Sequence, residues 1–261
     1  MIWAAFVSEW IKLRRWTLLL STFIGLAAAA SLFVILLFTQ APATGDGGGL
    51  PSLQQLARPN GLIVGVTRAT MLLGIVAFGI AAAQTASEYS LGTLRQLLVR
   101  QPRRVTLLAG KMLGVVTFLL LALCFAALAA FAVAVIAAHA RHVPTTAWFT
   151  ATGLGDLFRA LGDIALAVIG FSVLGLVIGQ FLRSAVFAVI VGVAWIIAVE
   201  NIITRIVPGT AKWLPGTALD TVAAGGGEGV SYAHGLIVAA VYLIAATAAT
   251  AVTFTRRDVT A

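Results

Sequence analysis

Charged residues are scarce in this sequence: they make up 10% of its 261 residues, whereas hydrophobic residues make up 61%. Soluble domains are about one-quarter charged. A chain with so few charges cannot cover a water-facing surface, so its solvent is expected to be lipid. Its length suits about six helical spans of roughly 20 residues each. The composition therefore predicts an all-α, polytopic membrane protein that forms a single transmembrane domain over residues 1–261.

Cysteine and histidine are almost absent. Cys124 is the single cysteine, which excludes an intrachain disulfide. The three histidines do not form the H-E-x-x-H pattern of metalloproteases. The phosphate-cradling pattern G-x-x-x-x-G-K-[ST] is also missing, because Gly110-Lys111 is followed by Met112. No metal ion, cofactor or nucleotide is therefore expected on this chain, and any ATP and Mg²⁺ would be bound by a partner subunit.

Six apolar stretches account for most of the chain. The first is too long for the apolar core of a signal peptide, so it is expected to remain as a span. Before it, Ile2, Phe6, Trp10 and Leu13 recur at helical spacing, which predicts an interfacial helix within residues 1–15. Two further segments lie outside the spans: a polar one at 86–111 and an outer one at 200–231. The predicted spans are about 16–39, 62–84, 112–138, 157–182, 185–199 and 232–254.

The basic residues predict the orientation. The net charge of +8 is expected of a membrane protein whose cytoplasmic loops collect Lys and Arg, and it does not call for nucleic acid as a partner. Both termini are then cytoplasmic, in agreement with an even number of spans. The abundance of Ala, Gly and Arg relative to Lys is typical of a GC-rich bacterium. The expected location is its cytoplasmic (inner) membrane. The residues placed on the cytoplasmic side are Lys12, Arg14, Arg15, Arg95, Arg100, Arg103, Arg104, Lys111, Arg183, Arg256 and Arg257.

A few charges fall inside or near the spans. Such residues are costly in lipid and normally face a cavity, a partner or the interface. Asp163 is the best candidate for a substrate path, paired with Arg68. Arg159 and Glu200 are expected to extend from helix ends into the interface. Pairs of glycines four residues apart, such as Gly110/Gly114 and Gly175/Gly179, allow close approach between helices.

The segment after the second span has a pattern of its own. Gly92 and Thr93 interrupt the preceding helix and can cap a new one. Leu94, Leu97 and Leu98 then form one apolar side of a short helix, with Arg95 on the other, and Pro102 ends it. Arg103 and Arg104 lead into the third span, where Lys111 is expected to reach lipid phosphates. Such a helix suits docking to a soluble partner, but an interfacial loop has the same composition.

The run E-Y-S-x-G-T-L-R-x-L-L-x-x-x-P-x-R at 88–104, followed by L-x-G-K at 108–111, resembles the permease subunits of ABC-2-type transporters. The N-terminal S-E-W-x-K-L-R-R and the charged C-terminal end are similar to that family as well. The resemblance implies a permease of an ATP-driven exporter, in which this segment docks in a cleft of a separate ATP-binding cassette subunit and a second permease copy or paralogue completes the path. The coupling residues that it implies are Glu88, Gly92, Thr93, Leu94, Arg95, Leu97, Pro102 and Arg104.

Two other functions are compatible with six spans. Six spans with Ser172 and His234 are reminiscent of rhomboid-type serine proteases, but Ser172 is mid-span and His234 is near a helix start, so they are separated in depth by on the order of 10–15 Å. The glycine expected after the serine is also missing. The remaining alternative is a stand-alone channel-like or scaffold protein that works without an ATPase. Transport by the purified chain in liposomes without ATP would favour that alternative.

Overall fold

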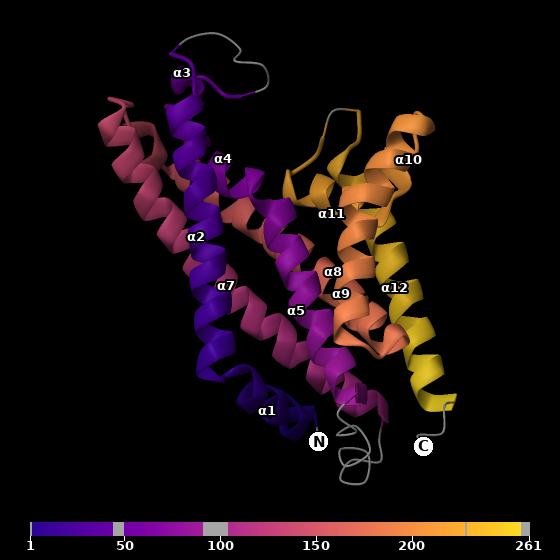
Figure 1. The fold of residues 1–261 in the computed structure, drawn as a ribbon. Helices are drawn as coiled ribbons and strands as arrows, with labels where there is room; N and C mark the ends of the chain where they lie inside the picture. The colour runs from indigo at the N-terminus through magenta and orange to yellow at the C-terminus, as the bar shows by residue number, and fades with distance from the viewer. Residues whose placement is uncertain (1, 44–49, 91–103, 228, 257–261) are drawn as a thin grey trace.

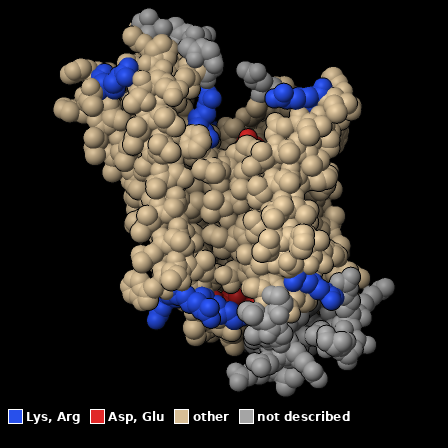
Figure 2. Space-filling view, viewed as in Figure 1, with Lys and Arg blue, Asp and Glu red and all other residues tan. Residues whose placement is uncertain are grey.

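The computed structural model describes residues 2–43, 50–90, 104–227 and 229–256. Long helices form almost all of this part of the chain, and no named strand occurs in it. Six helices are long and apolar enough to cross a membrane. Figure 2 shows basic side chains at both ends of the molecule, with a wide uncharged belt between them on the face in view. The prediction of an all-α, multi-pass membrane protein is confirmed.

The spans run up and down the bundle in chain order (Figure 1). Each is continuous in its apolar part because its residues are mostly Ala, Leu, Val and Ile, whose backbone groups are satisfied within the helix. The helices that contain the six spans are α2 (Trp16–Gln40), α5 (Thr70–Ser90), α7 (Arg104–Ala140), α8 (Ala151–Leu182), α9 (Ala185–Ala194) continued by a π-helical turn (Trp195–Val199) and α10 (Glu200–Ile206), and α12 (Tyr232–Arg256).

The second span differs from its prediction. A separate short helix, α4 (Gly61–Arg68), precedes α5, and a turn at Ala69 interrupts the helical backbone between them. The span itself covers Thr70–Tyr89 instead of 62–84. The charge on Arg68 explains the shift, because a helix that began at Leu62 would carry this guanidinium into the apolar layer. Ending α4 at Arg68 leaves that side chain exposed, at the end of the bundle opposite α1.

The N-terminal helix α1 (Ile2–Leu13) lies across the end of the bundle, close to the start of α7 (Figure 1). Its buried residues are Ala5, Glu9 and Leu13, one turn apart. The sequence predicted Ile2, Phe6, Trp10 and Leu13 as the apolar face, so the face that packs on α7 is rotated from the expected one. The figure places the end of α12 at this same end of the molecule.

The tightest packing joins α5 and α8. A Cβ on Gly175 would overlap the carbonyl oxygen of Phe78, and one on Gly179 would overlap that of Ala82. Small residues let helix backbones approach in this way, and close packing replaces the hydrophobic effect as the force between helices in lipid. The predicted close approach at Gly175/Gly179 is therefore confirmed.

The fifth span continues to Ile206, so the segment predicted at 200–231 begins after that residue. It contains a short helix, α11 (Pro215–Ala223), between α10 and α12. One side of α11 is buried, and it packs on α8 and α12. Its N-terminus faces the carboxylate of Glu200.

Candidate functional site

Most of the predicted coupling residues lie outside the described part of the chain. These are Gly92, Thr93, Leu94, Arg95, Leu97 and Pro102. The structure does place the two ends of the segment: Glu88 is in the last turn of α5, and Arg104 is the first residue of α7. The surroundings of Glu88 are therefore what the structure reveals of the predicted coupling site.

Glu88 is the centre of an ion-pair network that joins three helices. Its Oε1 accepts a hydrogen bond from Nζ of Lys12 in α1, at 2.6 Å, and its Oε2 accepts one from Nζ of Lys111 in α7, also at 2.6 Å. Lys12 Nζ donates to Oε1 of Glu9 as well, at 2.9 Å. We call these four residues, Glu9, Lys12, Glu88 and Lys111, the base network. Short charge-assisted bonds of this kind are among the stronger ones in proteins.

Burial makes the base network costly to break. Glu9, Glu88 and Lys111 are 3%, 7% and 5% exposed, and only Lys12 is open to solvent on one side. The two carboxylates and two ammonium groups balance in charge, which is the condition under which buried ions are tolerated. Lys111 was expected to reach lipid phosphates; it is buried instead, because Glu88 offers a nearer anion.

The titration of the α1 members reflects this setting. Burial raises the pKa of the Glu9 carboxyl, and the charge of Lys111 opposes that rise. For Lys12, burial lowers the pKa, but the carboxylates of Glu88 and Glu9 outweigh it, so the pKa is raised. Among the described residues, Glu9 Oε2 has no hydrogen-bond partner. The raised pKa of Lys12 means that its side chain stays charged beside the two carboxylates.

Two glycines of α7 place α1 where the network can form. A Cβ on Gly110 would overlap the Cβ of Ala5, and a Cβ on Gly114 would lie 2.9 Å from the Cβ of Glu9. The absence of side chains at these positions lets α1 lie directly on α7. The predicted Gly110/Gly114 pair is therefore the surface of α7 on which α1 packs. Gly110 is next to Lys111 in the chain.

Tyr89 connects the same turn of α5 to a fourth element. The guanidinium of Arg183 lies 5.5 Å from the centre of the Tyr89 ring, a cation–π distance. Arg183 occupies the short turn between α8 and α9 with a φ of 55°, the left-handed conformation that ends α8. The end of α5, next to residues 91–103, thus contacts α1, α7 and the α8–α9 turn through two successive side chains.

The predicted path residues meet at the opposite end of the bundle. Arg68 and Asp163 line one cleft of about 390 Å³, together with Asp156 and Arg159. The hydroxyl of Tyr232, at the start of α12, donates to Oδ1 of Asp163 at 2.8 Å. The sequence suggested only Arg68 as the partner of Asp163. The sequence did not indicate Tyr232 as a partner, because it is 69 residues from Asp163 in the chain.

Glu200 corrects another prediction. It was expected at the interface, yet it is 2% exposed. Its carboxylate accepts hydrogen bonds from the N–H groups of Gly216 and Thr217, at 2.8 and 2.9 Å, and from Nε1 of Trp195 at 3.1 Å. Because the first N–H groups of a helix have no partner within it, a buried carboxylate there stabilises α11 and fixes it to the fifth span.

Replacing Glu200 with glutamine is expected to lower the free energy of unfolding by about 1–3 kcal/mol, because the amide has one acceptor oxygen for three donors. Thermal unfolding of the purified chain in detergent measures this change. Asn201→Ala, at an exposed neighbouring position, serves as the control and should leave the midpoint almost unchanged. Equal midpoints for the two variants would contradict the role of Glu200.

The residues of the protease alternative have separate partners. The Ser172 hydroxyl donates to the carbonyl oxygen of Val168 at 2.6 Å. Nε2 of His234 lies 3.0 Å from the carbonyl oxygen of Lys212, and its ring packs on Trp213. Within the described ranges, no group of three His, Cys, Asp or Glu side chains is placed to hold a metal ion.

Comparison with known proteins gives the family of the chain. No curated protein matches it. A family model described as a protein of unknown function, DUF2705, matches residues 57–260, which include five of the six spans, the end of α5 and the cleft that contains Arg68 and Asp163. By this match over most of its length, the chain belongs to the DUF2705 family, whose function is unknown.

Proposed function

We propose that this protein is the permease subunit of an ATP-driven, ABC-2-type exporter in the cytoplasmic membrane of a bacterium, with both termini in the cytoplasm. A separate ATP-binding cassette subunit would bind ATP and Mg²⁺, and a second permease subunit would complete the translocation path. The observation that carries the proposal is the base network. It connects both helices that flank residues 91–103 to each other and to α1.

The network suits the transmission of force. A partner that moves residues 91–103 would pull on the end of α5 and the start of α7, which the chain connects to that segment directly. Glu88 joins these two helices by short ion pairs, so they would move together with α1. Without these ion pairs, α5 and α7 could move independently of each other. Interactions that make several helices one rigid unit are what a mechanical coupling device requires.

The orientation is supported by the charge distribution. The end of the bundle that holds the base network also carries Arg14, Arg15 and Arg183, all of them exposed. Residues 91–103 add three more arginines. An excess of Lys and Arg near span ends favours the cytoplasmic side. The soluble ATPase would then face this end.

The test is co-purification from the native membrane. A tagged chain is expected to recover an ATP-binding cassette subunit in near-equal amount, identified by mass spectrometry and by its ATPase activity. The double variant Leu94→Asp/Leu97→Asp should reduce that recovery at least tenfold, because two carboxylates cannot enter an apolar groove. Gln96→Asp, a polar position of the same segment, is the matched control and should retain the partner.

Two results would refute the proposal. One is a chain that recovers no ATP-binding cassette subunit; the other is a complex that is unchanged in the Leu94→Asp/Leu97→Asp variant. Solute movement by the purified chain in liposomes without ATP would favour a stand-alone channel instead.

A further inference from the structure

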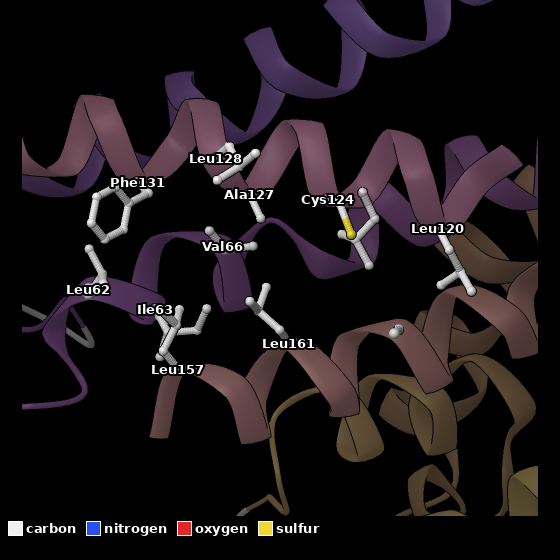
Figure 3. Close-up of a pocket in the computed structure, with 12 residues that line it drawn as sticks. Leu62, Ile63, Val66, Leu120, Cys124, Ala127, Leu128, Phe131, Leu157 and Leu161 are labelled. Atoms are coloured by element: carbon white, nitrogen blue, oxygen red, sulfur yellow. The ribbon is translucent and has the colours of Figure 1, made fainter. Parts of the chain in front are cut away.

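An apolar cavity of about 280 Å³ lies between α4, α7 and α8. Figure 3 shows its walls: Ile63 and Val66 from α4, Cys124 and Phe131 from α7, and Leu157 and Leu161 from α8. In the part of the chain that the structure describes, every residue that lines the cavity is hydrophobic. A buried water molecule needs two to four polar partners, so the cavity suits hydrocarbon and not water.

The cavity is closed at its back and open at its front. Ile63 and Val66 at the back are 6% and 3% exposed. At the front, Leu128 of α7 is 69% exposed, and Cys124 is exposed as well. Both of these α7 residues lie inside an apolar span, so the medium outside the opening is the hydrocarbon of the bilayer. A molecule that fills the cavity would therefore enter it from the membrane.

The cavity lies in the half of the bundle that is away from α1. Cys124 and Phe131 are in the half of α7 that ends at Ala140, and Leu157 and Leu161 are near the start of α8. Figure 1 places these ends of α7 and α8, together with α4, opposite α1. The opening therefore faces the hydrocarbon chains of one leaflet, the one opposite α1.

The dimensions of the cavity limit what can fill it. Its lining extends along α7 from Leu120 to Phe131, about 16 Å at a rise of 1.5 Å per residue. This length is about half of the roughly 30 Å hydrocarbon core of a bilayer. Spread over that length, the volume of about 280 Å³ corresponds to a mean cross-section of about 18 Å². An α-helix with side chains is about 10 Å wide, or about 80 Å² in section. The cavity is too narrow for a helix of another chain, and it admits one extended alkyl chain.

We propose that the cavity binds one acyl chain of a bilayer phospholipid from the leaflet opposite α1. The chain would supply the contacts that the side chains of α4, α7 and α8 otherwise lack on one side. The helix α4 has eight residues and does not cross the membrane itself, so the acyl chain would complete its packing against two spans. The headgroup would remain at the membrane surface, outside the cavity. This binding does not depend on the proposed function.

The test measures how much phospholipid stays on the chain after purification in a steroid-based detergent, whose fused rings are wider than the cavity. Native mass spectrometry is expected to show one retained phospholipid on most molecules. The headgroups of the retained lipids should match those of the source membrane within twofold, because the cavity contacts only hydrocarbon.

Filling the cavity with side chains should exclude the lipid. Ala127 and Ala165 line it from α7 and α8, and Ala127→Leu/Ala165→Leu is expected to lower the retained phospholipid at least fivefold. An unchanged circular dichroism spectrum shows that this variant is folded. Ala132→Leu adds the same side chain at an exposed position of α7 outside the cavity, so it should retain the lipid as the unmodified chain does.

The single cysteine of the chain reports where the lipid binds. Phosphatidylglycerol added back to protein that has been stripped of lipid should slow the labelling of Cys124 by N-ethylmaleimide at least fivefold. Cys124→Ala/Ile136→Cys moves the thiol to an exposed position of α7 outside the cavity. Labelling of that variant should change less than twofold.

Several results would overturn the proposal. The site does not exist if the purified chain retains no phospholipid, or if Ala127→Leu/Ala165→Leu retains as much as the unmodified chain. Selection of one headgroup by more than fivefold would mean that the lipid is recognised elsewhere. A retained apolar compound other than a phospholipid would give the cavity a different ligand. A disulfide-linked dimer through Cys124 in oxidised membranes would show that a second copy of the chain covers the opening.

Discussion

Replacing Glu88 with glutamine is expected to destabilise the protein by about 3–5 kcal/mol, because removing one member of a buried ion pair leaves its partner charge uncompensated. After the change, the ammonium groups of Lys12 and Lys111 would face the single carboxylate of Glu9. Lys111 is the more costly of the two, since it is 5% exposed. Thermal unfolding of the purified chain in one detergent measures the effect.

Two further variants distinguish a charge effect from a packing effect. Glu88→Gln/Lys111→Met removes an anion and a cation together, and it should recover much of the lost stability because a buried pair can be replaced by apolar groups at little cost. Asp156→Asn removes an exposed carboxylate at the other end and should change stability by less than about 0.5 kcal/mol. If Glu88→Gln behaved like Asp156→Asn, the base network would not hold the helices together.

Gly175→Ala is expected to be about as disruptive as a large core substitution, at roughly 3 kcal/mol or more. The added methyl group would overlap backbone atoms of Phe78 in α5, and a backbone cannot rotate away as a side chain can. The helices α5 and α8 would have to separate along the contact that includes Gly179. Unfolding in detergent, followed by the loss of helical circular dichroism, measures this effect.

The same helix provides a control of opposite sign. A Cβ on Gly162 would meet no atom within 4 Å, so Gly162→Ala should stabilise α8 by about 1 kcal/mol through helix propensity alone. A similar midpoint for Gly162→Ala and Gly175→Ala would show that the α5–α8 contact is looser than described.

The spans could be predicted from the sequence because residues that contact the lipid chains must be apolar. Runs of about 20 apolar residues are visible without any knowledge of partners, and so are the glycine pairs at Gly110/Gly114 and Gly175/Gly179. The turn at Ala69 could not be predicted. The charge of Arg68 can be accommodated either by an interrupted helix or by a side chain that extends to the interface.

The partners of the buried charges could not be predicted. Glu9, Glu88 and Lys111 each occur in a locally polar pattern that also fits a solvated helix end. What buries them is the meeting of three segments that are far apart in the chain. Glu200 and Tyr232 are similar cases, because their hydrogen-bond partners lie 16 and 69 residues away. The hydrophobic periodicity of one segment does not indicate which distant segments it contacts.

The π-helical turn in the fifth span determines the direction of Glu200. In a continuous α-helix, the eight residues from Gly192 to Glu200 would turn the side chain about 80° away from the Gly192 face, at about 100° per residue. One extra residue taken up by the turn at Trp195–Val199 reduces this to about 20°. The glycine that admits the Phe78 ring and the carboxylate that caps α11 therefore share one face. A single added residue allows one helix to direct an apolar contact at Gly192 and a hydrogen-bonded carboxylate at Glu200 to the same side.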